Sequence, residues 1–329
     1  MIVNKSTVPV GTANSVTAVI ADELGKRPDK GLKFSVVSNL GFLKKDATIG
    51  DFNSPDRIVF DTDYERTTNI LRNMYAPFQR NHDRAMVMNI KSYELTKYEA
   101  NVMLATWTSF TNELVTFAEK LITKIEEVRK GIGSGQRIGY RFLYSGCGSC
   151  FCNDVRAIKQ TATALGMLLK ILQAVEDLNH AQKPVFFEKI TGRFGSDLID
   201  KSFAIWALTL KPTTDDVREA NSDAVLSGLW ARGARVPVCY PVAMQEIQRI
   251  CGQRPDLRHA QSAHAALNGA DTLLVAADWK PFKSPDLDQI RTHRKRPIIF
   301  AGHNLFEPSG MLAMRLTCFS IGRASLTER

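Results

Sequence analysis

The sequence of 329 residues lacks the features that place a chain in a membrane or a secretory pathway. No stretch approaches the roughly 18 consecutive apolar residues that a membrane-spanning helix requires. The opening segment, Met1–Val10, has neither a long apolar core nor a small-residue cleavage site, so no secretory signal is visible. We therefore expect a cytoplasmic protein with no membrane partner.

The sequence also lacks the Gly-x-Gly-x-x-Gly fingerprint that opens a dinucleotide-binding unit. Its 6 cysteines, without secretory context, do not predict a disulfide framework. Three of them, Cys147, Cys150 and Cys152, lie close together in the sequence, and three interpretations are open. The first is half of a zinc site, although the sequence offers no second Cys-x-x-Cys nearby. The second is a redox pair, although the expected preceding strand is missing. The third is a set of buried, inert thiols. We predict no metal.

Positive charge is in excess but spread out, with a formal net charge of +9 and a sequence pI of about 9.3. The one dense run, Arg291–Arg296, precedes an apolar strand at Pro297–Phe300 and is predicted to be a solvated loop. The alternative, a nucleic-acid or targeting patch, has no accompanying nucleic-acid-binding motif. We expect the basic balance to suit an anionic small substrate, with no nucleic-acid partner.

Strands alternating with helices predict a parallel α/β sheet in the first part of the chain. The expected elements are a strand at 2–3, a helix at 12–24, strands at 34–38 and 57–60, a helix at 64–75 and a strand at 86–90. Apolar residues at spacings of three and four then predict one long helix over 91–130. A glycine-rich loop at 131–149 and a second helix at about 155–178 follow.

The α/β alternation resumes near residue 201 and predicts a second doubly wound domain. The expected elements are strands at 202–208, 236–240, 272–276 and 297–301, and helices at 220–232 and 244–250. Gly233 is well placed to stop the first of these helices. The fold class is thus α/β, with an incomplete N-terminal Rossmann-like domain (1–90), a central long-helix domain (91–182) and a C-terminal Rossmann-like domain (183–329).

The densest candidate site is the loop Phe142–Val155. Cys150 lies just before an expected helix start, where the helix dipole lowers the pKa of a thiol, so it is a sensible nucleophile. Asp154 could orient a water or a lysine. Lys97 and Asn101 are spaced i and i+4 and share a helix face. Together they could hold a sugar hydroxyl or an oxyanion. The alternative is that Lys97 is solvated and that the amide of Asn101 packs between helices.

Several segments in the same order resemble the UDP-glucose/GDP-mannose dehydrogenase family, and its UDP-glucose branch. These segments are Lys5–Thr12, Ser38–Asn39, Phe42–Leu43, Pro55–Val59, Glu94–Tyr98 with Asn101, Gly131–Gly139, Phe142–Val155, Phe203–Trp206, Lys211–Ala220, Pro241–Met244 and Ile321–Arg323. The resemblance covers essentially the whole chain. It implies an NAD-dependent oxidation of UDP-glucose to UDP-glucuronate, an NAD-binding first domain, a central dimerisation domain and a UDP-sugar-binding last domain.

The same resemblance implies roles for individual residues. Cys150 would attack the C6 aldehyde and form a thiohemiacetal and then a thioester. Asp154 and Lys97 would handle proton and water chemistry, and Lys97 with Asn101 would stabilise charge on the C6 oxygen. Thr7 would act near the nicotinamide.

The implied substrate contacts are Phe42, Leu43, Lys44, Arg137, Phe142, Leu143, Tyr144, Ser145, Gly146, Gly148 and Lys211. Arg218 would touch NAD. Arg137 would reach a substrate in a neighbouring subunit, which implies a homodimer or a higher homo-oligomer.

The sequence departs from the family pattern at several of these positions. Gly41 stands where the family has a catalytic glutamate, Cys152 and Asn153 replace a proline and a lysine, and the loop before Ser149 is shorter. Together with the missing glycine-rich fingerprint, these departures support an alternative. In that alternative the chain is a catalytically inactive, N-terminally truncated relic that retains UDP-sugar binding or oligomerisation only.

Overall fold

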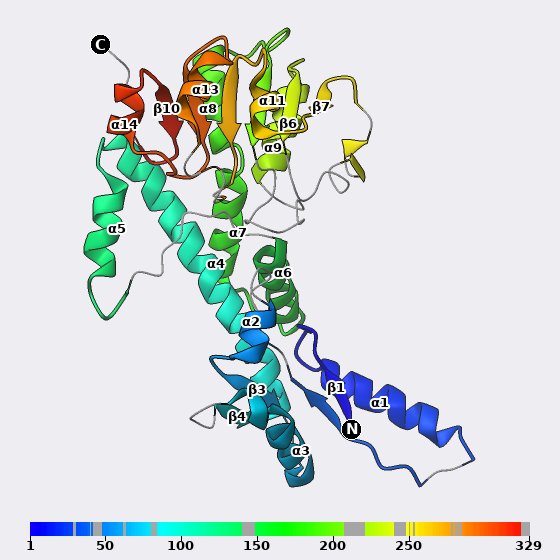
Figure 1. The fold of residues 1–329 in the computed structure, drawn as a ribbon. Helices are drawn as coiled ribbons and strands as arrows, with labels where there is room; N and C mark the ends of the chain where they lie inside the picture. Colours follow the sequence, from blue (N-terminus) through cyan, green and yellow to red (C-terminus); the bar gives the residue numbers. More distant parts are fainter. Residues whose placement is uncertain are drawn as a thin grey trace. The chain divides into compact units, whose positions relative to one another are not determined.

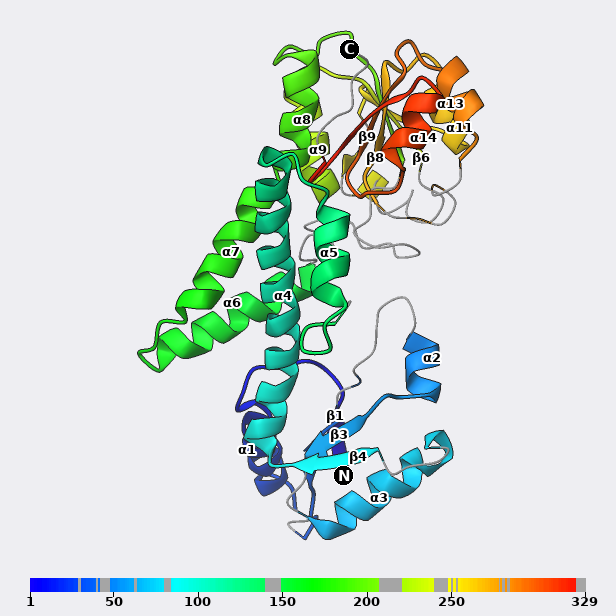
Figure 2. The same ribbon diagram turned by 90° about the vertical axis from the view of Figure 1, so that its left-hand side faces the viewer.

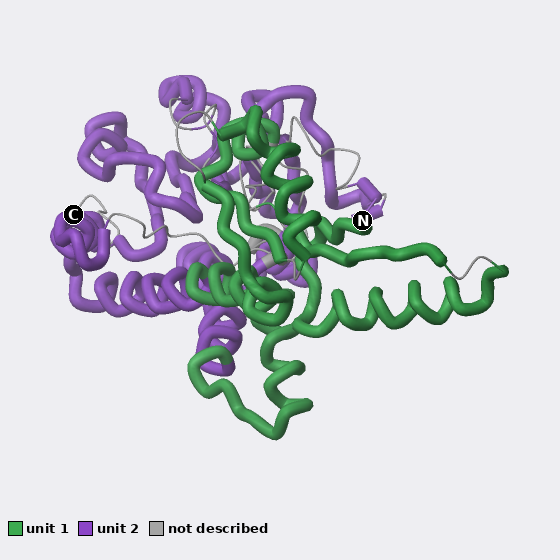
Figure 3. Tube along the Cα trace, turned by 90° about the horizontal axis from the view of Figure 1, so that it is seen from below, with its two compact units in different colours: residues 1–104, 153–172 green, residues 105–152, 173–329 purple. Residues whose placement is uncertain are grey.

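The computed structural model describes residues 1–28, 31–39, 41, 48–61, 64–79, 84–139, 149–206, 221–239, 248–249, 251–252, 254–277, 279, 282 and 285–323. The chain forms two compact units, coloured separately in Figure 3. The first unit comprises residues 1–104 and 153–172, and the second comprises residues 105–152 and 173–329. Three helices, α4 (Ile90–Lys120), α6 (Ser149–Ala164) and α7 (Lys170–Gln182), contribute residues to both units.

The first unit begins with short parallel strands and helices in alternation (Figure 1). Its elements are β1 (Ile2–Asn4), α1 (Thr12–Gly25), β2 (Val36–Ser38), α2 (Thr48–Asn53), β3 (Ile58–Asp61), α3 (Glu65–Tyr75), the 3-10 helix η1 (Ala76–Phe78) and β4 (Ala85–Met88). β1 pairs with β2 and β3 pairs with β4, both in parallel. The predicted α/β alternation is confirmed.

A small apolar core and two polar ties hold β2 beside β3. Val37 packs with Ile58 and Phe60 in one buried cluster. The amide of Asn39 donates to the backbone oxygen of Val59 at 3.0 Å, and the backbone N–H of Ser38 donates to the carboxylate of Asp61. The carboxyl end of β2 is therefore held in place beside β3.

The predicted single helix over 91–130 is wrong in its continuity. The structure has α4 (Ile90–Lys120) and α5 (Ile125–Gly133), separated by a sharp turn at Ile122, whose φ is +56°. Backbone bonds from Thr123 to Ala118 and from Ile122 to Glu119 close the helix end in the Schellman pattern. A β-branched residue in the left-handed region is rare, so nothing local in the sequence signals this turn.

The second predicted helix is also divided. α6 (Ser149–Ala164) ends at Gly166, which adopts a φ of +72°, and α7 (Lys170–Gln182) follows. The backbone N–H of Met167 closes the end of α6 by donating to Ala162 at 2.8 Å. Glycine at the left-handed position after a helix is the usual stop signal, so here the sequence does contain the cue.

The second unit contains a six-stranded parallel sheet in the order β10-β9-β8-β5-β6-β7. The strands are β5 (Phe203–Trp206), β6 (Val236–Cys239), β7 (Leu257–His259), β8 (Thr272–Val275), β9 (Ile298–Ala301) and β10 (Thr317–Ser320). Counted from β5, this is the Rossmann order 3-2-1-4-5-6 read from its other edge. The second doubly wound domain is confirmed.

Helices cover both faces of this sheet (Figure 2). α8 (Val185–Phe194) and α9 (Asn221–Trp230) lie on one side, and α11 (Ala263–Leu267), α13 (Leu287–Thr292) and α14 (Pro308–Ala313) lie on the other. Every residue of β5, β6, β8 and β9 is buried, as a parallel sheet between two helix layers requires. Gly233 follows α9 with a φ of +77°, as predicted, whereas the expected helix at 244–250 falls largely outside the described residues.

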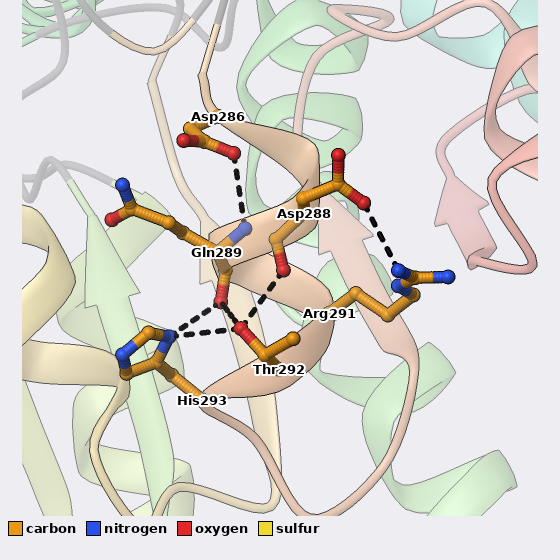
Figure 4. A network of polar contacts seen from close by, with 6 residues as sticks. All are labelled: Asp286, Asp288, Gln289, Arg291, Thr292 and His293. Atoms are coloured by element: carbon orange, nitrogen blue, oxygen red, sulfur yellow. Dashed lines mark hydrogen bonds and ion pairs between the residues drawn. The ribbon is translucent and has the colours of Figure 1, made fainter.

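The first part of the basic run is the end of α13 rather than a loop (Figure 4). Asp286 caps the helix by accepting the backbone N–H of Gln289 at 3.0 Å. Arg291 pairs with Asp288 at 3.1 Å, and Nδ1 of His293 lies 2.9 Å from the backbone oxygen of Gln289. These contacts stabilise the two ends of α13.

The prediction of a solvated loop is wrong for Arg294, which is only 8% exposed. Its guanidinium donates to the backbone oxygens of Ile290, at 2.7 Å, and of Ile298. Burial lowers the pKa of Arg294 to about 10. Arg296 stacks on the ring of Phe194, 5.4 Å from its centroid. The run therefore attaches α13 to β9 instead of presenting a uniform basic surface.

The segment after β10 attaches to α4 and α5 through hydrogen bonds to two carboxylates. The backbone N–H of Gly322 donates to Glu119 at 2.9 Å, and Nε of Arg323 donates to Glu126 at 2.9 Å. Val115 lies directly against Gly322, whose φ is +75°. Within the described residues, no helix is both long and apolar enough to cross a membrane.

We expect Gly322→Ala to lower the free energy of unfolding by about 1–3 kcal/mol, because it combines a left-handed backbone with a clash against Val115. Gly310→Ala is the matched control, since Gly310 lies in α14 with open space around it and should gain slightly in stability. Chemical denaturation of both variants checks this. Equal stability of the two would contradict the tight contact.

Candidate active site

The candidate site is built on the first turns of α4 and on α6. The amide of Asn101 donates to Oδ2 of Asp154 at 2.6 Å, across 53 residues of sequence. Lys97 lies one turn before Asn101 on α4, and its positive charge acts on Asp154. The structure thus brings together three of the predicted residues, Lys97, Asn101 and Asp154, all half-buried.

Burial raises the pKa of Asp154 above its ordinary value, while the hydrogen bond from Asn101 and the charge of Lys97 oppose the rise. Tyr98 is buried beside this group. Burial raises the pKa of Tyr98, and the carboxylates of Asp154 and Glu94 raise it further. A carboxyl group poised in this way, with a lysine and a carboxamide beside it, can take or give a proton.

Cys150 is the second residue of α6, and its side chain lies outside the described residues. It stands at the N-terminal end of a 16-residue helix, where the dipole favours a thiolate, and four residues before Asp154. Cys147 lies outside the described residues. Cys152 is buried, and the amide of Asn179 donates to its sulfur at 3.1 Å, so the inert-thiol interpretation fits this cysteine.

Thr7 is exposed in the turn between β1 and α1. Both ends of that turn are anchored. At one end, Nζ of Lys5 donates to Asn39 and to Tyr75, each at 2.8 Å. At the other end, the N-terminus of α1 is held by Glu94.

Since β1 and β2 run parallel, their carboxyl ends lie at one edge of the sheet. Thr7 follows β1 at this edge, and Asn39 follows β2. Ligands of open α/β sheets bind at this edge, so the residues present fit the nicotinamide side of a dinucleotide.

Arg137 is exposed, after the end of α5. The remaining predicted contacts lie outside the described residues: Phe42, Leu43, Lys44, Phe142, Leu143, Tyr144, Ser145, Gly146, Gly148, Lys211 and Arg218. Among the residues that the structure does describe, no group of three or more His, Cys, Asp or Glu side chains could hold a metal ion.

No role was predicted for Glu94 or Tyr98, although both lie in the segment Glu94–Tyr98 that resembles the family. For Glu94, its spacing from Lys97 and Asn101 could have indicated a place in the site. Glu94 is three residues before Lys97 and seven before Asn101, so all three lie along one face of a helix.

Three models of one family match the chain in order. The NAD binding domain of the UDP-glucose/GDP-mannose dehydrogenase family matches residues 1–79, its central domain residues 91–181 and its UDP binding domain residues 204–308. A UDP-glucose 6-dehydrogenase of Pseudomonas aeruginosa is 39% identical over 331 aligned positions, covering 98% of this chain and 72% of that protein. The chain belongs to the UDP-glucose/GDP-mannose dehydrogenase family.

Other family members agree with this assignment. The UDP-glucose 6-dehydrogenase TuaD of Bacillus subtilis is 33% identical, covering 99% of this chain and 69% of its own length. A UDP-glucose dehydrogenase structure from Pyrobaculum islandicum superposes with a TM-score of 0.84 at 30% identity, covering 98% of this chain and 70% of that one. The family resemblance, the oxidoreductase class and the NAD-binding and UDP-binding domains are confirmed.

We expect Asp154→Asn to change how stability depends on pH. A carboxyl group with a raised folded pKa holds its proton more tightly in the folded chain than in the unfolded chain. The wild type should therefore lose stability relative to Asp154→Asn as the pH rises from about 3.9, the usual aspartate pKa, through the folded value. Above the folded value the difference should be constant.

Urea unfolding of both proteins between about pH 4 and about pH 7 measures this difference. Asp177→Asn, at an exposed position of α7, controls for the loss of a charge. Parallel pH curves for the wild type and Asp154→Asn would contradict a raised pKa.

Proposed function

We propose that the chain catalyses the NAD-dependent oxidation of UDP-glucose at C6 to UDP-glucuronate. The observation that carries the proposal is the hydrogen bond between Asn101 and Asp154, with Lys97 beside it. Asp154 lies on α6, the helix that also carries Cys150. Similarity to three UDP-glucose dehydrogenases over nearly the whole chain supports this substrate.

The proposed chemistry assigns a step to each residue. NAD, when bound, supplies the hydride acceptor. The C6 alcohol loses a hydride and a proton to give an aldehyde, and the Cys150 thiolate adds to it to form a C–S bond. Lys97 and Asn101 stabilise the negative charge on the C6 oxygen. Loss of a second hydride leaves a thioester.

Water then cleaves the thioester, which releases the carboxylate and restores the thiol. Asp154 takes the proton from this water, a role for which a carboxyl group of raised pKa is suited. Gly41 offers no carboxylate where the family has one, so Asp154 and Lys97 carry the proton transfers in this chain.

The proposal includes the placement of residues in the site and of the domains. Thr7 faces the nicotinamide, and Arg218 contacts NAD. The UDP-sugar is held by Phe42, Leu43, Lys44, Lys211 and the loop at 142–148. The domain division at residues 90 and 182 is supported by the spans of the three family models. A cytoplasmic location is supported by Cys239, Cys251 and Cys318, which form no disulfide within the part of the chain that the structure describes.

The same proposal makes the chain a homodimer through its central helices. Phe110 and Phe117 on α4 and Leu121, which directly follows it, are 53%, 57% and 56% exposed. They recur at i, i+7 and i+11 and form one apolar stripe. Exposed aromatic side chains in a row are typical of an association surface. A second copy of the chain fits this surface, because the family resemblance implies that Arg137 reaches a substrate in a neighbouring subunit.

The direct test is NADH formation by the purified chain with UDP-glucose and NAD, followed by absorbance. We expect two NADH for each UDP-glucuronate, and we expect Cys150→Ala to abolish the second oxidation. Asp154→Asn should lower kcat by about a hundredfold or more, since it removes the acid–base group. Formation of UDP-glucuronate by the Cys150→Ala variant would contradict the thioester route. No NADH from the wild type would instead favour the inactive relic.

For the dimer, sedimentation velocity should show the wild type as a dimer and the double variant Phe110→Asp, Phe117→Asp as a folded monomer. Val19→Asp, at a residue of α1 that is 62% exposed, is the matched control and should remain dimeric. A monomeric wild type at all concentrations would overturn this part of the proposal.

A further inference from the structure

Glu94 is a buried carboxylate that binds backbone rather than a cation. It lies in the second turn of α4 and is 1% exposed. Its Oε2 accepts the backbone N–H of Gly11 at 2.6 Å, and its Oε1 accepts that of Ala13 at 2.9 Å. Both oxygens are thus engaged at the N-terminus of α1, where the helix dipole also favours a negative charge.

α1 has no cap from its own sequence. Its N-cap residue, Gly11, adopts a left-handed conformation with a φ of +97° and has no side chain to accept the free amides. Glu94, 83 residues further along the chain, supplies the missing acceptor for Gly11. The point at which α1 begins is therefore set by α4.

This contact holds one end of the turn that carries Thr7. The other end is held by Lys5, which donates to Asn39 and Tyr75. Only three residues separate Thr7 from Gly11, so a shift of Gly11 changes the path of the short turn that carries Thr7.

The same stripe of α4 carries the rest of the site. At about 100° per residue, Glu94, Lys97 and Asn101 fall within an arc of about 60° on one side of the helix. Glu94 holds the Thr7 turn there, and Asn101 holds Asp154. One rigid helical surface therefore fixes both groups.

We propose that Glu94 is a positioning residue, whose carboxylate fixes the Thr7 turn, and with it the nicotinamide, against the carbon that Lys97, Asn101 and Asp154 hold. This inference rests on the proposed function. Its physical basis is that hydride transfer requires a close, aligned approach, and a displacement of about 1 Å can cost about a hundredfold in rate.

The test compares Glu94→Ala and Glu94→Gln with the wild type in the complete chain. Glu94→Ala removes both acceptors, so kcat should fall by about ten- to a hundredfold, with the KM for UDP-glucose unchanged. Glu94→Gln keeps one carbonyl oxygen and should lose less. Glu99→Gln, an exposed charge change on α4, is the matched control and should behave as wild type.

The decisive readout is the deuterium isotope effect on kcat, measured with UDP-glucose that carries deuterium at both C6 positions. A longer hydride transfer limits the rate more strongly, so the isotope effect should rise in Glu94→Ala. A purely structural role would lower the melting temperature and the active fraction but leave the isotope effect per turnover unchanged. Hydrogen exchange at Gly11 and Ala13 should accelerate in the same variant.

Three outcomes would overturn the inference. An unchanged isotope effect in an active Glu94→Ala variant would show that Glu94 serves folding alone. Unchanged exchange at Gly11 and Ala13 would show that the clamp does not exist. If the wild type forms no NADH, the proposed function itself fails, and the positioning role fails with it.

Discussion

A carboxylate removed from water must be compensated, and this constraint organises the first unit of the chain. An unpaired buried charge costs several kcal/mol, so Glu94 is tolerated only with donors at both oxygens. The donors are the opening amides of α1, which in turn lack any cap of their own. The buried carboxylate and the uncapped helix end thus satisfy each other. Their hydrogen bonds fix α1, the turn before it and β1 against α4.

The second unit depends on apolar burial instead. Its central strands are covered on both faces, and the strand order leaves the switch point between β5 and β8 as the place where the chain can open to a ligand. At the periphery of the sheet, the buried Arg294 connects α13 to β9. This chain therefore combines a candidate site held by polar contacts with a UDP-binding domain built on a continuous apolar core.

Local patterns in the sequence predicted the α/β alternation, the doubly wound second domain and the stop at Gly233, because each depends on hydrophobic periodicity or on a residue with a special backbone preference. The shared face of Lys97 and Asn101 followed from helical spacing. The division of the long helix at Ile122 was not predictable, since a β-branched residue at a left-handed position is a cost that only tertiary contacts can offset.

The burial of Arg294 and the role of Glu94 were also beyond local reasoning. Arg294 lies in a basic run, and such residues are predicted to be solvent-exposed unless their partners are known. Its partners are the backbone oxygens of Ile290 in α13 and Ile298 in β9. For Glu94 the partners lie about 80 residues earlier in the chain. Local patterns could not show which donors meet this carboxylate.

The hydrogen bond between Asn101 and Asp154 also has a consequence for the order in which the chain folds. It closes a loop of 53 residues, for which the chain-length contribution to closure entropy is about 3.5 kcal/mol. The segment 105–152 between them belongs to the other compact unit. Asp154 can therefore meet its partner cheaply only after that intervening segment has compacted. We therefore expect the hydrogen bond between Asn101 and Asp154 to form late in folding, so that a chain arrested before this step would carry Cys150 without the paired Asp154.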